Sequence, residues 1–328
     1  MRNPPSRALP AALLAVALLA VLAAGASAAS SAQIVALLNK ERAANGIPAG
    51  IAENTAWSAA CRQHNTYQAK NRVFGHTEIE GKSGFSREGN LIAATSVLAQ
   101  GIKWGPGDPY DNAPYHLFDL LNPRISSTGA ADSEGFGCVE ILLGTLRPAP
   151  TSVQLYTYPG NGRRNVPYRQ KASELPETPG QTLGLGTRAT GPNLLVYVEG
   201  PWSNGSRAQL SNATLGSAHG SVALRWLDNT TSNLLAPTGA ILVPVAPLRP
   251  ATRYKVTVEG AVQGVQPGTT IDQALAGSCQ QQPDGSVSCG QPAPTACVED
   301  FAAQQPVCGL SQSWPFKQSW TFTTRRKR

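Results

Sequence analysis

The spacing of apolar residues predicts a helix near the start of the chain. In residues 33–44 (QIVALLNKERAA), the apolar side chains of Ile34, Leu37 and Leu38 recur at helical spacing, with charged residues on the opposite side. The next residues, 45–48 (NGIP), place a glycine where a helix cap favours one, followed by a proline that cannot continue the helix. We therefore expect this helix to end at about residue 44.

The same kind of pattern predicts that the first half of the chain contains both helices and strands. Thr55 begins a second helix that runs to about Arg72, because apolar and aromatic residues fall three or four positions apart. Residues 74–90 are expected to form a loop, and residues 101–114, which Gly and Pro interrupt, an exposed loop. The remaining expected elements are a helix over 91–100, a short helix over 116–121, and strands over 137–142 and 153–158.

The pattern changes after residue 158, where no further helix is predicted. Short apolar runs separated by turn residues favour a β-sandwich. The stretch PTGAILVPVAPLRPATRYKVTVEG, residues 237–260, resembles bacterial immunoglobulin-like or fibronectin-type modules. The predicted strands span residues 193–198, 222–227, 240–245, 254–258 and 319–323.

The chain has six cysteines, an even number that predicts disulfides in an exported protein. The simplest partition joins Cys61 to Cys138 and leaves two bonds among the four later cysteines, which can pair in three ways. A zinc knuckle is the alternative, but the spacings are long and no histidine lies nearby. The four later cysteines are Cys279, Cys289, Cys297 and Cys308, and they belong to a Gly-, Gln- and Pro-rich insertion over 264–312.

The first 29 residues have the pattern of a secretory signal peptide. Basic residues at the start precede an apolar run over 11–24 and a small-residue cleavage site at 25–29. The alternative is an uncleaved membrane anchor, for which the apolar run is short. No later stretch is long and apolar enough to span a bilayer, so we expect a secreted or cell-surface protein.

The formal net charge of +7 changes this picture little. Two cations belong to the expected signal peptide and four form the tail at 325–328, which leaves about one positive charge for the body. A nucleic-acid footprint needs clustered charge, so we expect no nucleic-acid partner. The tail could contact anionic wall polymer or lipid headgroups, although a solvated, frayed end is the simpler interpretation.

Four segments resemble the CAP superfamily, also called the SCP/PR-1 domain. The first two are IVALLNKERAANGIP, which is similar to the opening helix of the family, and AWSAACRQHNTYQAKNRVFGHTE, which is similar to a helix that leads into a histidine loop. The other two are EGNLIA and PYHLFDLLNPRISSTGAA, which resemble the G-E-N-I-A and P-G-H-R segments of the family. The resemblance covers residues 33–158, about two-fifths of the chain.

This resemblance implies an α-β-α sandwich with a cleft of two histidines and two acids that binds a divalent metal, often zinc, in some members. His76 and His116 match the histidines. Glu88 matches the first acid, although the chain has Glu-Gly-Asn where the family has Gly-Glu-Asn. Asp108 is the candidate for the second acid, which in the family follows a tryptophan directly, and Asp111 is the alternative.

The residue types support two interpretations of this set. Two imidazoles and a carboxylate can bind zinc and polarise a water molecule, or they can form a hydrogen-bonded cluster that ties loops together. His64, on the second helix, is expected either to lie beneath the sheet or to support the cleft residues from behind. Common local catalytic signatures, such as G-x-S-x-G and H-E-x-x-H, are absent, and no serine or cysteine nucleophile is evident.

We therefore expect an α+β protein with a CAP-like domain over 30–160 and an immunoglobulin-like β-sandwich over 161–328. The missing nucleophile and the departure from the family's set of histidines and acids favour binding over turnover. The resemblance implies that the ligand is a small apolar molecule such as a sterol or fatty acid, or an extracellular protein or cell-wall component. One alternative is a metal-assisted extracellular hydrolase that uses His76, His116 and Glu88. The other alternative is a passive surface component.

Overall fold

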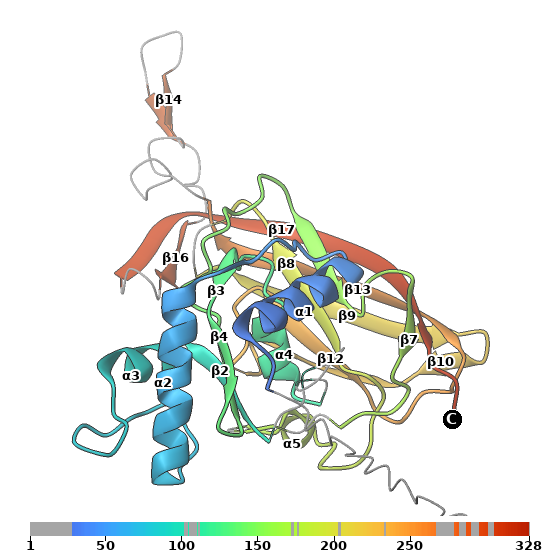
Figure 1. The fold of residues 1–328 in the computed structure, drawn as a ribbon. Coiled ribbons are helices and arrows are strands. Elements are labelled where there is room, and N and C mark those ends of the chain that lie inside the picture. The colour runs from blue at the N-terminus through green and yellow to red at the C-terminus, as the bar shows by residue number, and fades with distance from the viewer. Residues whose placement is uncertain are drawn as a thin grey trace, which may run out of the picture.

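The computed structural model describes residues 28–327 apart from short gaps at 102–103, 105–109, 111, 172–173, 176, 203–204, 233, 267–278, 282–286, 290–294 and 301–304. The expected signal peptide therefore lies outside the described residues, except for its last two positions. Across these described ranges, none of the helices has the length and apolar character that a membrane span requires. The protein is a mixed α+β structure (Figure 1).

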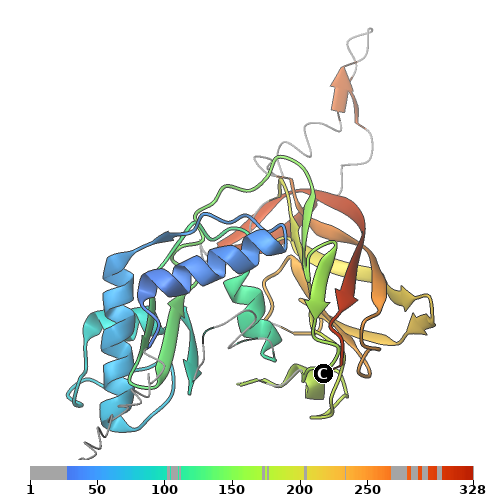
Figure 2. The same ribbon diagram turned by 45° about the vertical axis from the view of Figure 1, so that its right-hand side comes forward.

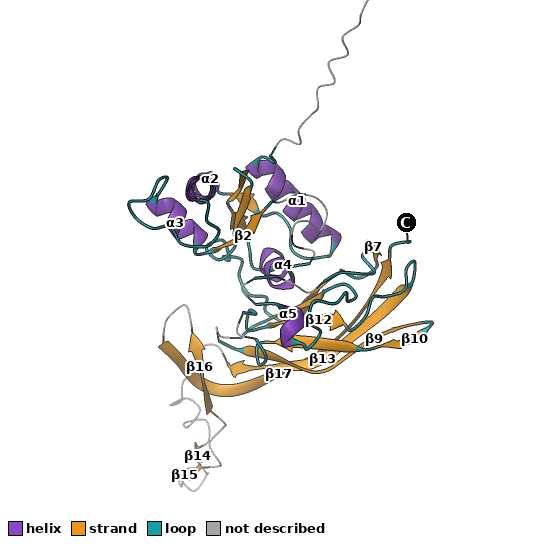
Figure 3. Cartoon of the chain, turned by 90° about the horizontal axis from the view of Figure 1, so that it is seen from below, coloured by secondary structure: helices purple, strands orange, loops and turns teal. Residues whose placement is uncertain are grey.

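A three-stranded antiparallel sheet forms the centre of the first half. Its strands are β2 (Ser96–Gln100), β5 (Phe136–Glu140) and β4 (Ala130–Ser133), in that order. Neighbouring residues of a strand point to opposite faces of a sheet. Accordingly, Leu98 and Cys138 pack with α2 (Thr55–Asn71), while Val97 and Val139 belong to the core that contains α1 (Ser31–Ala44) and α4 (Pro114–Leu120). The sheet thus lies between two helical layers (Figure 3).

Local capping explains why the first two helices begin and end where the sequence predicts. Ser30 and Gln33 form a reciprocal capping box at the start of α1, and Gly46, with a φ of +71°, follows its end. Asn54 caps α2 by accepting hydrogen bonds from the backbone N–H groups of residues 56 and 57. The predictions of helices over 33–44 and 55–72 are confirmed.

The predicted helix over 91–100 is wrong. A seven-residue helix, α3 (Arg87–Ala93), begins inside the expected loop and ends before β2. The side chains of Thr95 and Ser96 donate hydrogen bonds to the Ile92 carbonyl at 3.1 and 2.7 Å, which closes the helix. The apolar run that follows is buried as a strand, a case that periodicity cannot distinguish from a short buried helix.

Two antiparallel sheets face each other in the second half. The smaller has the order β11-β12-β8-β6, and the larger has the order β10-β9-β13-β17-β16, with β7 parallel to β17. Buried side chains from both, such as Val196 of β8 and Val256 of β13, form one core between them. The strands are β6 (Gln154–Tyr158), β7 (Arg163–Val166), β8 (Leu194–Glu199), β9 (Arg207–Ser217), β10 (Gly220–Val222), β11 (Leu224–Asp228), β12 (Gly239–Pro244), β13 (Arg253–Val265), β16 (Thr295–Asp300) and β17 (Gln305–Thr324).

Several elements were not predicted from the sequence. Among them are the long strand β9, the shorter strands β4, β7 and β16, and a single helical turn, α5 (Pro179–Thr182). The remaining small elements are a parallel pair, β1 (Ala52–Glu53) and β3 (Ser127–Thr128), and a hairpin of β14 (Cys279–Gln281) and β15 (Val287–Cys289). The immunoglobulin-like assignment of the two facing sheets stays a prediction.

The four-stranded sheet packs on both of its faces. The face turned away from the larger sheet contributes Leu195, Tyr197 and Ile241 to the core that contains α1 and α4. There the rings of Phe118 and Tyr197 stack at 4.2 Å between centroids, and the Tyr197 hydroxyl donates to the Phe118 carbonyl at 2.8 Å. Strand β6, which precedes residue 160, pairs with β8, which follows it. The two halves therefore share an apolar core.

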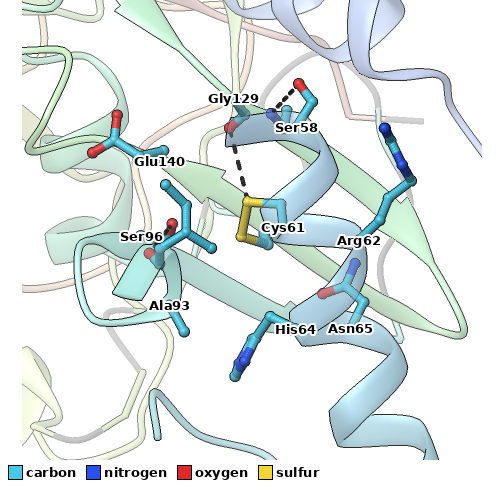
Figure 4. Close-up of a disulfide and its surroundings, with 12 residues drawn as sticks. Ser58, Cys61, Arg62, His64, Asn65, Ala93, Ser96, Gly129 and Glu140 are labelled. Atoms are coloured by element: carbon cyan, nitrogen blue, oxygen red, sulfur yellow. Dashed lines mark hydrogen bonds between the residues drawn. A yellow bond between two sulfur atoms is a disulfide. The ribbon is translucent and has the colours of Figure 1, made fainter. Parts of the chain in front are cut away.

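The disulfide between Cys61 and Cys138 is confirmed, with 5.5 Å between the Cα atoms (Figure 4). It joins α2 to β5 inside a small buried cluster. A second disulfide joins Cys297 to Cys308 across neighbouring strands β16 and β17. Residues 279 and 289 are register partners in the hairpin, but their side chains lie outside the described part of the structure.

Candidate functional site

An apolar cavity lies between α1 and α4. Its volume is about 160 Å³, and its wall is formed mainly by aliphatic side chains of the two helices and of β5. Helix α1 crosses above α4 and runs toward β7 (Figure 2), so that the second half of the chain also reaches the wall through Arg163. The lining residues are Ile34, Leu37, Leu38, Lys40, Glu41, Ala44, Trp104, Tyr110, Leu117, Leu120, Leu121, Val139 and Arg163.

Two aromatic residues in this wall carry polar atoms without a partner. Tyr110 is only 4 % exposed, and neither its hydroxyl nor the indole Nε1 of Trp104 has a hydrogen-bond partner within the described structure. The two rings meet edge to face, with 6.4 Å between centroids. A buried polar group without a partner costs free energy, so such groups are rare and usually have a reason. Burial also raises the pKa of Tyr110 above its usual range, which keeps the hydroxyl protonated and able to donate.

A shallow groove of about 490 Å³ adjoins the cavity along α1. The groove and the cavity share three lining residues, Leu37, Lys40 and Trp104, so the indole of Trp104 lies where the two spaces meet. Lys40 is exposed and contributes a positive charge at the same place. An elongated molecule could therefore lie partly in the cavity and partly in the groove.

An ion pair closes another side of the cavity. Both carboxylate oxygens of Glu41 accept hydrogen bonds from one guanidinium nitrogen of Arg163 at 3.0 Å. This contact joins α1 to β7 across the boundary expected at residue 160. A partly buried ion pair of this kind fixes geometry more than it adds stability.

The structure pairs His116 with Glu174, a residue that the sequence did not identify as part of the site. The Nδ1 atom of His116 is hydrogen bonded to Glu174 Oε2, and the carboxylate also accepts from the backbone N–H groups of residues 115 and 116 at 2.6 and 3.1 Å. The ring of Tyr110 stacks on the imidazole, with 5.8 Å between centroids. The imidazole thus has one nitrogen held by a carboxylate, an arrangement that orients the other nitrogen.

Two further polar residues lie beside this pair. Burial raises the pKa of Asp119 to about 7, an effect that His116 opposes and Glu174 reinforces. The hydroxyl of Tyr115 lies 2.9 Å from Ser232 Oγ and 3.1 Å from Glu177 Oε1. Burial is the main cause that raises the pKa of Tyr115. Glu174 and Glu177, the acidic partners of His116 and Tyr115, come from the second half of the chain, which contacts α4 here.

The other candidate residues lie in the loop that begins after α2. His76 is exposed, and its Nδ1 is hydrogen bonded to the Ala93 carbonyl at 2.7 Å. Glu88 is exposed in the first turn of α3. Asp108 and Asp111 lie outside the described residues. The prediction that residues 101–114 are exposed is wrong for Tyr110, which is buried.

His64 is buried beneath this loop. Its Nδ1 lies 2.9 Å from Glu78 Oε1 and its Nε2 lies 2.9 Å from the Gly75 carbonyl. Glu78 also accepts a hydrogen bond from the backbone N–H of Ser86 at 2.8 Å. His64 and Glu78 therefore tie the two ends of the loop over 74–90 to α2, which fits a structural role for this histidine. Its ring projects from the α2 helix beside Cys61 (Figure 4).

The metal-site prediction gains no geometric support from the part of the chain that is described. No three potential ligands among His, Cys, Asp and Glu converge there. His76 and His116 each have Nδ1 engaged by an oxygen acceptor, a contact that metal-binding histidines commonly make. The described members of the donor set do not assemble around one point, and the assignment stays a prediction.

Comparison with known proteins adds no family. Neither a scan against protein-family models nor a search of curated proteins gives a match. The resemblance to the CAP superfamily therefore rests on the four segments described above and on nothing else. The site must be interpreted from its own residues.

Proposed function

We propose that this protein is an exported binding protein that holds an acyl or alkyl chain in the cavity between α1 and α4. The observation that supports the proposal is an apolar cavity whose wall includes Tyr110 and Trp104, two residues whose donors Oη and Nε1 have no partner among the described residues. A ligand whose oxygen acceptor reached either donor would satisfy it, and the rest of the ligand would fill the apolar space. Pockets that combine an apolar wall with a few polar groups are typical binding sites.

The size of the cavity favours a flexible chain over a rigid sterol. A cavity of about 150 Å³ holds a molecule the size of benzene. A space of about 160 Å³ therefore accepts only part of an acyl chain, and the adjoining groove can take the remainder. A fused ring system cannot bend from one space into the other. Lys40, which lines both spaces, favours an anionic end group such as a carboxylate.

Binding fits the surroundings of the cavity better than turnover does. The His116–Glu174 pair is not part of the cavity wall, and the wall residue Tyr110 stacks on the imidazole of His116. The titratable groups that line the cavity are Lys40, Glu41, Tyr110 and Arg163, of which Glu41 and Arg163 are paired with each other. No nucleophile with a neighbouring base is present among these lining residues.

A matched pair of tyrosine variants tests the proposal. Tyr110→Phe removes a hydroxyl for which the described part of the chain offers no partner, so the variant should be as stable as the wild type, or about 1 kcal/mol more stable. Its affinity for a fluorescent polyene fatty acid should nevertheless fall about threefold to tenfold, because one hydrogen bond to the ligand is lost. Fluorescence titration measures the affinity, and urea denaturation measures the stability.

Tyr115→Phe is the control. Its hydroxyl has partners in Ser232 and Glu177 and lies outside the cavity wall, so this variant should lose about 1 kcal/mol of stability and keep its affinity. Absence of fatty-acid binding to the wild type, or equal affinity of the wild type and Tyr110→Phe, would overturn the proposal. Cholesterol serves as the rigid comparison ligand, and it should bind at least tenfold more weakly.

A further inference from the structure

A second groove lies on the outer face of the six-stranded sheet, away from the helices and from the cavity. Its volume is about 710 Å³, and it crosses β10, β9, β13 and β17. In this sheet Tyr254 and Val256 point into the core, so the alternating residues Arg253, Lys255 and Thr257 point outward. The lining residues are Thr214, Leu215, Gly216, Ser217, Ala218, Gly220, Ser221, Arg253, Tyr254, Lys255, Thr257 and Thr321.

The floor of the groove is formed by glycine. Gly216 pairs with Lys255 on one side and with Ser221 on the other, and a Cβ atom added there would meet nothing closer than the Gly220 carbonyl, at 3.8 Å. Glycine is uncommon inside strands and often marks a place where another molecule approaches the backbone. The trough is open at this position because residue 216 has no side chain and no neighbouring side chain fills the space.

In the four strands that line the groove, the charge is positive and almost unopposed. Strands β9, β10 and β17 contain no acidic residue, and the only acid of β13, Glu259, is paired with Lys317 at 2.6 Å. Arg253 and Lys255 line the groove and have no ion-pair partner in the described structure.

The first residue of the basic tail, Arg325, is held between the end of β7 and the residues just before β13. The Arg325 backbone N–H donates to the Val166 carbonyl, and the Arg325 carbonyl accepts from Ala251, at 2.8 and 3.1 Å. The expectation of a frayed tail is therefore wrong at Arg325. The exposed residues Arg249, Arg325, Arg326 and Lys327 extend the positive charge beyond the groove.

Hydroxyl groups of β9, β13 and β17 lie on the same face as Arg253 and Lys255. Thr257 and Ser319 are hydrogen bonded at 2.7 Å, Arg253 donates to Thr321 Oγ1 at 3.3 Å, and Thr214 pairs with Thr257 across the strands. Hydroxyls both donate and accept hydrogen bonds, which suits a polyhydroxylated ligand. Cations add attraction for carboxylate, sulfate or phosphate groups on such a ligand.

We infer that the outer face of the six-stranded sheet binds an anionic polysaccharide along the groove beside Gly216. The described part of this face presents no exposed large apolar side chain for insertion into a membrane. It also presents no exposed aromatic ring on which a nucleic-acid base could stack, and base stacking is a main source of affinity for single strands. Cations, hydroxyls and an open trough together match a charged sugar chain.

The experiment measures binding of the full chain to immobilised polygalacturonate and heparin at low ionic strength. Arg253→Glu/Lys255→Glu should weaken binding at least tenfold, because two attractive charges become repulsive. Gly216→Val should weaken it about fivefold without any change in charge, because it fills the trough with a residue that strands favour. Binding to neutral dextran should be at least tenfold weaker than to the anionic polymers.

Arg62→Glu/Lys70→Glu is the matched control, since it makes the same charge change on exposed residues of α2. This variant should keep its affinity. Equal loss in the control, or full affinity in the groove variants, would overturn the inference. Equally tight binding to dextran, to oligothymidylate or to phosphatidylglycerol vesicles would also overturn it, because each identifies a different kind of ligand.

Discussion

Individual buried polar residues differ in how far the fold satisfies them. Arg42 is fully buried, and its Nε and Nη1 atoms donate to the carbonyls of Pro48, Leu120 and Asn122 at 2.8 to 3.1 Å, whereas its Nη2 atom has no partner among the described residues. Burial lowers its pKa to about 10, and the guanidinium still carries its charge at neutral pH. Tyr110, in contrast, has no partner for its hydroxyl within the described ranges of the chain. The first arrangement holds the structure together, and the second is the reason to expect a ligand.

Asp119 predicts a pH dependence of stability. Burial raises its pKa from 3.8 to about 7, so the folded state favours the protonated carboxyl. Since the unfolded chain ionises near pH 4, this residue lowers stability as the pH rises from 4 to 7, and the cost is constant above that range. Asp119→Asn should therefore be about 2 kcal/mol more stable than the wild type at pH 8, and the difference should shrink toward pH 4.

Urea denaturation between pH 4 and pH 8 measures this effect. A stability difference for Asp119→Asn that stays constant over the whole range would contradict the assignment of the raised pKa.

At the residue scale the sequence identified the members of the site only in part. The resemblance singled out His116, because it lies in a motif that can be compared locally. Its partner Glu174 is 58 positions away and belongs to no motif, so only the folded chain reveals it. Tyr110 was missed because Gly and Pro around it predict an exposed loop, whereas packing against Trp104 and His116 buries its ring.

The short helix α4 shows how much a secondary-structure element depends on distant residues. It has seven residues and no side-chain cap from its own sequence. A helix this short is marginal alone. Glu174 accepts from two N–H groups at its first turn, and Arg42 donates to the carbonyls at its end, so a negative and a positive side chain complement its dipole. The sequence predicts the helix but not the residues that stabilise it.

The disulfide between α2 and β5 should make a large contribution to stability at this scale. The bond closes a loop with a sequence separation of 77, so the loop-entropy estimate for its removal is about 4 kcal/mol. Cys61→Ala/Cys138→Ala should lose about this much free energy of unfolding, as measured by urea denaturation. Cys297→Ala/Cys308→Ala, which opens a loop with a separation of only 11, should lose less, about 3 kcal/mol. Equal losses would show that loop length does not govern the effect.

For the whole molecule, the contact between the halves is the feature that the sequence predicted least well. The division at residue 160 follows a change of pattern, and alternation correctly indicated many of the strands. Alternation cannot show that the four-stranded sheet is covered on both faces, because strands such as β8 and β12 are buried at every position and simply appear as continuous apolar runs. The resulting shared core predicts one cooperative unit.

A pair of glycines tests this interface. An added Cβ at Gly239 of β12 would collide with the ring of Phe118 of α4, so Gly239→Ala should cost about 2 kcal/mol by overpacking the junction. Gly216→Ala, in an open position of β9, should change stability by less than about 0.5 kcal/mol. Thermal and urea unfolding should both show a single transition for the wild type. Two separate transitions, with only one of them shifted by Gly239→Ala, would show that the halves unfold independently.

The stacking of the layers also sets which way the molecule would face on a surface. The helices lie on one side of the four-stranded sheet and the six-stranded sheet lies on the other (Figure 3). A molecule held on an anionic polymer by its outer sheet would therefore turn α2, α3 and the loop over 74–90 toward the surrounding medium. The polymer would cover the sheet and leave the helical side accessible, so that one side could anchor the protein while the other exchanges its ligand with the medium.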